Sequence, residues 1–198
     1  MYRVIVASNF TDAEEAAFRY WKQGNDGWGF SDIRAIVNGR VPPHIQQLRN
    51  KDLGMKANDM QSSLEEIARD MVSAIQKCPS VRGQEIYRVE GHYRVPRVGS
   101  EIELEMFTSF SKTLSESLLN NFGVPDGGVV YRLIANDSFR DISRIGKSSQ
   151  DAEAEVLSIK TMKYKVLDAK EERIGGEETW LGVVGGETYT IVDLKPLG

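Results

Sequence analysis

The 198-residue chain has few of the side chains that form disulfides and metal centres. It contains one cysteine, Cys78, and two histidines, His44 and His92. A single cysteine excludes an intrachain disulfide and is typical of a reducing compartment. The two histidines lie far apart, and no group of His, Cys, Asp or Glu has the spacing of metal ligands. The sequence therefore predicts no metal site.

Long hydrophobic runs and an excess of positive charge are also missing. No apolar run approaches about 18 residues, so we expect no membrane-spanning helix. Residues 1–7 are too short for the apolar part of a secretory signal, which predicts no signal peptide and a cytoplasmic location in the producing or target cell. Twenty-five Lys and Arg stand against 29 Asp and Glu, a net charge of −4, which argues against broad non-specific binding of nucleic acid.

The N-terminal part of the chain has the patterns of helices. Thr11 and Glu14 have the spacing of a capping box at a helix start. Apolar residues at helical spacing predict an amphipathic helix over 62–76. Shorter helical segments are expected at 31–37 and 44–48.

The character changes to strands after residue 84, with one helix expected over 114–122. Strands are predicted at 85–91, 101–108, 128–135, 155–159, 162–170 and 187–195. Helices followed by strands predict an α+β fold in a single domain, with a mainly helical lobe over 1–84 and a β core over 85–198. The polar stretch 136–152 is long for a connection, which favours a loop over a site.

Two carboxylates stand at the start of a predicted strand. Glu153 and Glu155 precede Val156 and Leu157, and in a strand they would project from one face, roughly 6–7 Å apart. Carboxylates placed side by side repel each other, so the pair favours a role toward a cationic or electron-poor partner. Arg88 and Ser109 come earlier in the chain, each at a predicted strand.

This order of arginine, serine and glutamate resembles the ADP-ribosyltransferases of the arginine–serine–glutamate class, which includes bacterial toxins and phage-encoded enzymes. The likeness extends over most of the chain, from about residue 18 to 194. It includes segments 20–39, 107–112, 141–143, 153–157, 163–166 and 188–194. Two departures stand out: Phe110 replaces the middle threonine of the family's Ser-Thr-Ser, and Val89 replaces a glycine that often follows the arginine. A third lies at Arg34 and Asn38, where the family often has Asn and an NAD-contacting Arg.

The resemblance implies an N-terminal helical lobe and a mixed or antiparallel two-sheet β core, with NAD as co-substrate. Glu155 would stabilise the oxocarbenium-like transition state, and Ser109 would hydrogen-bond to it and fix its rotamer. Glu153 would engage the acceptor, which is an arginine in family members with Glu at that position. The remaining residues implied to bind NAD are Arg88, Val89, Ser111 and Phe139, of which Arg88 would hold phosphate and Phe139 would stack on nicotinamide.

Alternatives stay open at this point. Phe139 and Phe110 could instead fill the core, and Ser111 could be a turn residue. The same fold could serve an NAD glycohydrolase, a transferase acting on a nucleic-acid base, or an inactive binding module. The expected partner is a target protein carrying an acceptor arginine, and the setting is either a phage-encoded enzyme or a bacterial effector.

Overall fold

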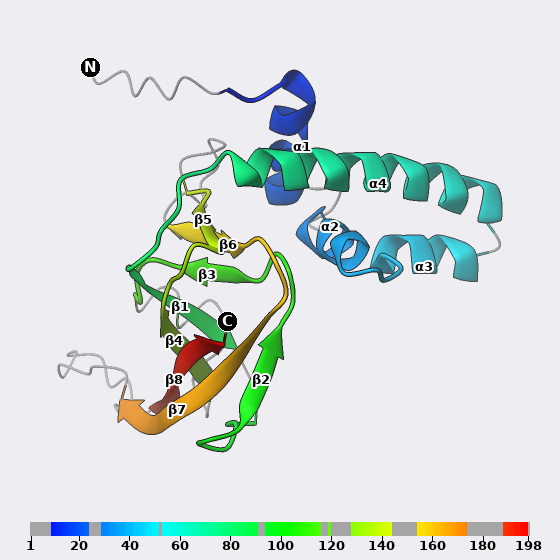
Figure 1. Cartoon of the computed structure of the whole chain (residues 1–198). Coiled ribbons are helices and arrows are strands. Elements are labelled where there is room, and N and C mark those ends of the chain that lie inside the picture. Colours follow the sequence, from blue (N-terminus) through cyan, green and yellow to red (C-terminus); the bar gives the residue numbers. More distant parts are fainter. Residues whose placement is uncertain are drawn as a thin grey trace, which may run out of the picture. The chain divides into compact units, whose positions relative to one another are not determined.

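A computed structural model describes residues 9–23, 29–51, 53–90, 94–115, 119, 128–143, 154–173 and 188–197. These residues divide into two compact units, which we call the helical unit (up to Pro79) and the β unit (from Ser80). Figure 1 shows the helices in the first and the strands in the second. The boundary lies close to the expected one at residue 84, and the expectation of a single domain stays a prediction.

The described residues of the helical unit form four helices: α1 (Asp12–Gln23), α2 (Gly29–Val37), α3 (Pro43–Asn50) and α4 (Gly54–Gln76). The last helix begins eight residues before the expected start at 62, because Ala57 is buried against Ile45 and Leu64. Packing on another helix thus extends α4 beyond the stretch with clear periodicity. Among the described helices, none is both long and apolar enough to cross a membrane.

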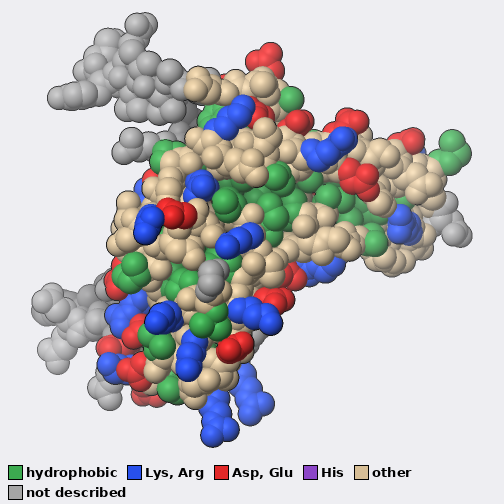
Figure 2. All heavy atoms as spheres, in the orientation of Figure 1, with side chains coloured by type: hydrophobic (Ala, Val, Ile, Leu, Met, Phe, Trp, Pro, Cys, Tyr) green, Lys and Arg blue, Asp and Glu red, His purple; other side chains and the backbone are tan. Residues whose placement is uncertain are grey.

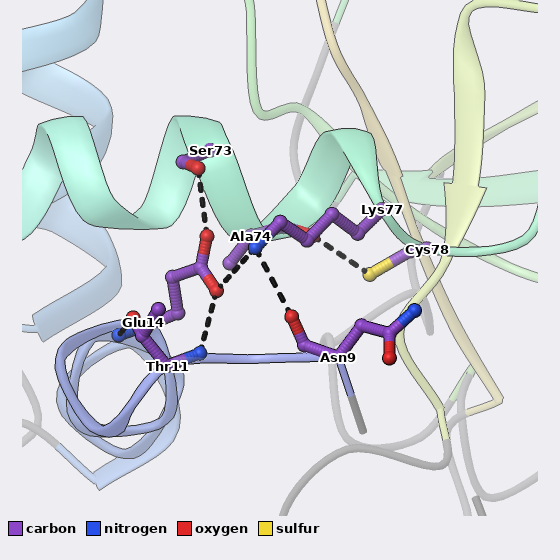
Figure 3. Close-up of polar contacts among 7 residues, drawn as sticks. All are labelled: Asn9, Thr11, Glu14, Ser73, Ala74, Lys77 and Cys78. Atoms are coloured by element: carbon purple, nitrogen blue, oxygen red, sulfur yellow. Dashed lines mark hydrogen bonds and ion pairs between the residues drawn. The ribbon is translucent and has the colours of Figure 1, made fainter. Parts of the chain in front are cut away.

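The start of α1 forms the predicted capping box. The Thr11 N–H donates to Glu14 Oε2 at 2.8 Å, and the Glu14 N–H donates to Thr11 Oγ1 at 3.2 Å. The Glu14 carboxylate also accepts from Ser73 Oγ of α4 and from Nζ of Lys77, the C-cap residue of α4, each at 2.7 Å (Figure 3). These bonds, the one from Lys77 first, lower the pKa of Glu14 from 4.5 to about 2. The cap therefore also joins the first and last helices of the unit.

The β unit contains eight strands in its described residues. They are β1 (Glu85–Glu90), β2 (Glu101–Leu104), β3 (Ser109–Ser111), β4 (Val129–Ile134), β5 (Phe139–Asp141), β6 (Glu155–Ser158), β7 (Met162–Arg173) and β8 (Thr188–Leu197). Their order in the sheet is β2-β7-β8-β4-β1-β3-β6-β5, with β4 and β8 parallel and the other pairs antiparallel. Helices and a mixed sheet confirm the α+β class.

The expectation of two separate sheets is corrected by this order. Five strands, from β2 to β1, continue into β3, β6 and β5 through the residue pair Tyr87↔Ser111. Both groups of strands contribute to one core, in which Phe110 and Val156 lie with Ile86 and Tyr164. The strands thus form one hydrogen-bonded sheet whose two parts bury side chains in a shared interior.

Strand boundaries differ from prediction mainly near the site. The expected strand 101–108 is two strands, β2 and β3, separated at Phe107, whose φ of 62° interrupts the extended backbone. The expected loop 136–152 contains β5 at its start. Most of the expected helix 114–122, and the rest of that loop from residue 144, lie outside the described residues.

Candidate active site

Arg88 lies on β1, held by two hydrogen bonds. Its Nη1 donates to the carbonyl oxygen of Ser109 at 3.0 Å, and its Nε donates to Glu90 Oε1 at 2.5 Å. The side chains of Arg88 and Glu90 are 16% and 23% exposed. Two bonds to different strands fix the plane of the guanidinium, which is the geometry needed to present a fork of donors to an anion. Two other arginines near β1 in the sequence, Arg94 and Arg97, are exposed and lie outside the strands.

Ser109 and Glu155 meet across β3 and β6. Ser109 pairs with Leu157 and Ser111 with Glu155, so Ser109 and Glu155 are diagonal neighbours on one face of the sheet. Ser109 Oγ donates to Glu155 Oε1 at 3.0 Å. The hydrogen bond expected from the sequence is therefore present. Because Arg88 contacts the backbone of the same serine, three strands bring arginine, serine and glutamate into one connected group.

The chain reaches β6 through a left-handed residue. Ala154 has φ of 47°, and β6 begins at Glu155. A residue in this region interrupts the two-residue alternation of an extended strand. The shared strand face predicted for Glu153 and Glu155 stays a prediction, because the described backbone begins at Ala154. Glu153 itself lies outside the described residues.

Two of the residues expected to bind NAD have buried side chains. Phe139 is fully buried on β5 and packs edge-to-face against Phe110, with ring centroids 5.3 Å apart. Val89 is buried with Val130 and Leu119 in a smaller core. The complete burial of Phe139 corrects the expected stacking of its ring on nicotinamide. The Val89 side chain also fills a core, and the expected contact of Val89 with NAD stays a prediction. Phe110, in place of the family's threonine, fills the core as well.

Ser111 takes part in a local turn. Its Oγ donates to the Thr113 carbonyl at 2.7 Å and accepts from the Thr113 N–H at 3.1 Å. Ser111 is 5% exposed. This arrangement agrees with the alternative that Ser111 is a turn residue, and it shapes the end of β3 beside Glu155.

A second polar group, absent from the expected site, lies at the ends of β3 and β5. Lys112 Nζ donates to Asp141 Oδ2 at 2.6 Å and to Ser143 Oγ at 3.1 Å. Burial alone would raise the pKa of Asp141, but the bonds from Lys112 and Ser143 outweigh it and hold that pKa below 3.8. No sequence pattern predicts the contacts of Lys112 with Asp141 and Ser143, because these residues lie 29 and 31 positions from it in the chain.

Charge on the β unit is mixed. On the face shown in Figure 2, Lys and Arg side chains of this unit lie among Asp and Glu side chains. Among the residues that the structure describes, no three His, Cys, Asp or Glu side chains gather as metal ligands do. The polar chemistry at the strand ends is thus that of arginine, serine, glutamate and a lysine–aspartate pair.

The fold is similar to that of several solved bacterial proteins. The enzymatic component C2-I of the C2-toxin from Clostridium botulinum superimposes with a TM-score of 0.64 at 15% identity, over 96% of this chain and 45% of that one. Plx2a, an ADP-ribosyltransferase toxin from Paenibacillus larvae, gives 0.60 at 13% identity, over 97% and 89%. The Salmonella SpvB ATR domain gives 0.58 at 15% identity, over 95% and 100%.

The chain spans less than half the length of C2-I but nearly all of Plx2a and the SpvB domain. No family model and no curated sequence matches it. At these identities the shared property is the arrangement of helices and strands. Together with the four helices and the mixed eight-stranded sheet, the likeness shows that this chain has the ADP-ribosyltransferase fold.

Proposed function

We propose that the protein is an NAD-dependent mono-ADP-ribosyltransferase that modifies an arginine of a target protein. The observation that carries the proposal is the connected group of Arg88, Ser109 and Glu155, in which Ser109 Oγ lies 3.0 Å from Glu155 Oε1. The fold is the same as that of proteins named as ADP-ribosyltransferases. Fold alone does not give a function, so the proposal depends on the chemistry of these side chains.

The residue types fit NAD. The Arg88 guanidinium, oriented by Glu90 and Ser109, is suited to a diphosphate because it is always charged and its donors form a rigid fork. An ionised Glu155 beside the ribose would stabilise positive charge at C1 and the ring oxygen, as carboxylates do in glycoside hydrolysis. The hydrogen bond from Ser109 limits the rotamers of Glu155 and so keeps that carboxylate in place.

In the proposed reaction the bond between ribose C1 and nicotinamide breaks, and its electron pair leaves with neutral nicotinamide. A guanidinium nitrogen of the acceptor then bonds to C1 and gives up a proton. Glu153 is the residue assigned to that proton and to pairing with the acceptor, because a carboxylate pairs well with a guanidinium. When water takes the acceptor's place, the same steps give hydrolysis of NAD.

The test is transfer of label from adenine-labelled NAD to proteins in a bacterial lysate. Wild-type protein is compared with Glu155→Gln and Glu153→Gln, which keep the side-chain shape and remove the charge. Label on one or a few proteins, lost with Glu155→Gln, supports the transferase. Loss of transfer with retained NAD hydrolysis in Glu153→Gln supports arginine as acceptor. Neither label nor nicotinamide release from the wild type would contradict the proposal.

A further inference from the structure

The lysine–aspartate pair at the strand ends crosses the strand that carries Glu155. Lys112 directly follows β3, Asp141 is the last residue of β5, and β6 lies between these two strands in the sheet. The pairs Ser111↔Glu155 and Asp141↔Val156 place the ion pair at the first residues of β6. Neighbouring strands are about 4.8 Å apart, so a lysine side chain is long enough to reach from one outer strand toward the other.

Backbone bonds at the same place continue the sheet beyond its regular pairs. The Lys112 N–H donates to the Ala154 carbonyl at 3.2 Å, and the Ile142 N–H donates to the Glu155 carbonyl at 3.0 Å. The residues just past β3 and β5 thus hold the start of β6 from both sides. The Lys112–Asp141 ion pair links the end of β3 to the end of β5. It is 2.6 Å long, and its side chains are 25% and 18% exposed.

Ala154, which these contacts hold, has an unfavourable backbone conformation. Ala154 is one of two non-glycine residues with positive φ among those described, and it directly precedes Glu155. Such a conformation persists when the surroundings fix it from several directions. Ser143 adds to the fixation, since its N–H and Oγ both donate to Asp141 Oδ1 while Lys112 occupies Oδ2.

We propose that Lys112, Asp141 and Ser143 form a clasp that holds the left-handed turn at Ala154 and thereby sets the position of the Glu155 carboxylate. The clasp acts through Glu155, so Lys112 and Asp141 are positioning residues. This inference rests on the proposed function for its effect on activity, whereas its effect on the backbone of β6 is independent of any reaction. The low pKa of Asp141 agrees with a carboxylate that stays ionised in the clasp.

The test on activity uses Lys112→Met, which keeps the aliphatic stem and removes the ammonium. We expect kcat for nicotinamide release to fall by about ten- to a hundred-fold, because small displacements of a catalytic group have effects of that size. The KM for NAD should stay nearly the same, and Lys112→Arg should restore most of kcat. Asp141→Asn should match Lys112→Met, and the double variant should be no worse than either.

The matched control is Lys170→Met, which removes another lysine–aspartate pair of the β unit, 3.1 Å long and on β7 away from Glu155. It should leave kcat unchanged. A wild-type kcat in Lys112→Met, or an equal loss in Lys170→Met, would overturn the clasp. A Lys112→Met loss that Lys112→Arg does not restore, or that raises KM alone, would also overturn it.

Hydrogen exchange separates this inference from the proposed function. The amides of Lys112 and Ile142, which bond to Ala154 and Glu155, should exchange faster in Lys112→Met than in wild type or Lys170→Met. If wild type releases no nicotinamide but these amides lose protection, the proposed function fails and the clasp stands. If their protection is unchanged in Lys112→Met, the clasp fails whatever the activity.

Discussion

The two units each contain a glutamate that accepts a hydrogen bond from a distant serine, but the surroundings differ. In the helical unit Glu14 is 3% exposed and accepts from Ser73, Lys77 and the Thr11 backbone. In the β unit Glu155 is half-buried and accepts from Ser109, a neutral donor. Arg88 of the same candidate site donates to Glu90 and to the Ser109 backbone carbonyl.

A carboxylate surrounded by donors and paired with a cation serves stability, because its charge is already balanced. A carboxylate at a reacting centre instead stabilises the positive charge that develops in a transition state, which is the role proposed for Glu155. We infer that the polar residues of the helical unit hold helices together, whereas those at the strand ends of the β unit act on a ligand. Four predictions test this contrast.

The largest effect on folding should come from the helical glutamate. Glu14→Gln removes the charge that pairs with Lys77 and weakens the acceptor for Ser73, so we expect Tm to fall by several degrees. Glu155→Gln should leave Tm unchanged or raise it, since functional sites often sacrifice stability. Thermal unfolding followed by circular dichroism measures both. The contrast fails if Glu155→Gln is the more destabilising of the two.

The two serines form a matched pair of smaller effect. Ser73→Ala should lower Tm by roughly 2–4 °C and leave the rate of nicotinamide release per folded molecule unchanged. Ser109→Ala should lower that rate about tenfold, because Glu155 loses the bond that fixes its rotamer, with little change in Tm. If Ser73→Ala and Ser109→Ala changed Tm and the rate of nicotinamide release by equal amounts, the proposed difference between the two units would be contradicted.

The ion pair between Arg88 and Glu90 offers a finer test. Glu90→Gln keeps an acceptor for Arg88 Nε and removes the negative charge that a diphosphate would face. We expect NAD to bind roughly fivefold more tightly, a change of about 1 kcal/mol, the upper range for partly exposed pairs. Glu90→Ala also removes the acceptor that orients the Arg88 guanidinium, so it should weaken NAD binding. Titration calorimetry with NAD gives both values, and weaker binding by Glu90→Gln would show that the charge is needed.

Acid should loosen the helical unit through Glu14. Its pKa is about 2 when folded and 4.5 ordinarily, so the unfolded chain takes up the proton first. The stability it provides is complete above about pH 4.5 and is lost as the pH falls toward 2. Asp32, whose pKa burial raises, opposes this trend. Between pH 5 and 2 the melting temperature should fall less steeply with pH in Glu14→Gln than in wild type. The same pH dependence in both proteins would contradict the low pKa assigned to Glu14.

Local patterns in the sequence predicted local structure well. Thr11 and Glu14 are three residues apart, so the capping box could be recognised directly. Ser73 and Lys77 are 59 and 63 residues from Glu14, and no periodicity relates such positions. Ser109 and Glu155 are also far apart, 46 residues, yet their contact was expected, because the order of motifs resembles a known family.

Errors of prediction came from short elements and backbone irregularities. The three residues of β5 are too few to show the alternation of a strand. Phe139 was therefore predicted to lie in a loop and to stack on nicotinamide, whereas it is fully buried. The positive φ at Phe107 and at Ala154 has no signal in the side chains of those residues. Such turns usually contain glycine. Because alanine and phenylalanine occupy these two positions, the sequence does not indicate the turns.

The most direct test of the NAD site is release of nicotinamide from NAD by the purified protein, because it requires no acceptor. Wild type, Glu155→Gln and Glu14→Gln are compared at a temperature where all three are folded. We expect release by wild type and by Glu14→Gln, and a rate roughly 10²–10³-fold lower for Glu155→Gln, the size expected for loss of one transition-state contact. No release by wild type, or an unchanged rate in Glu155→Gln, would contradict the assignment of Glu155.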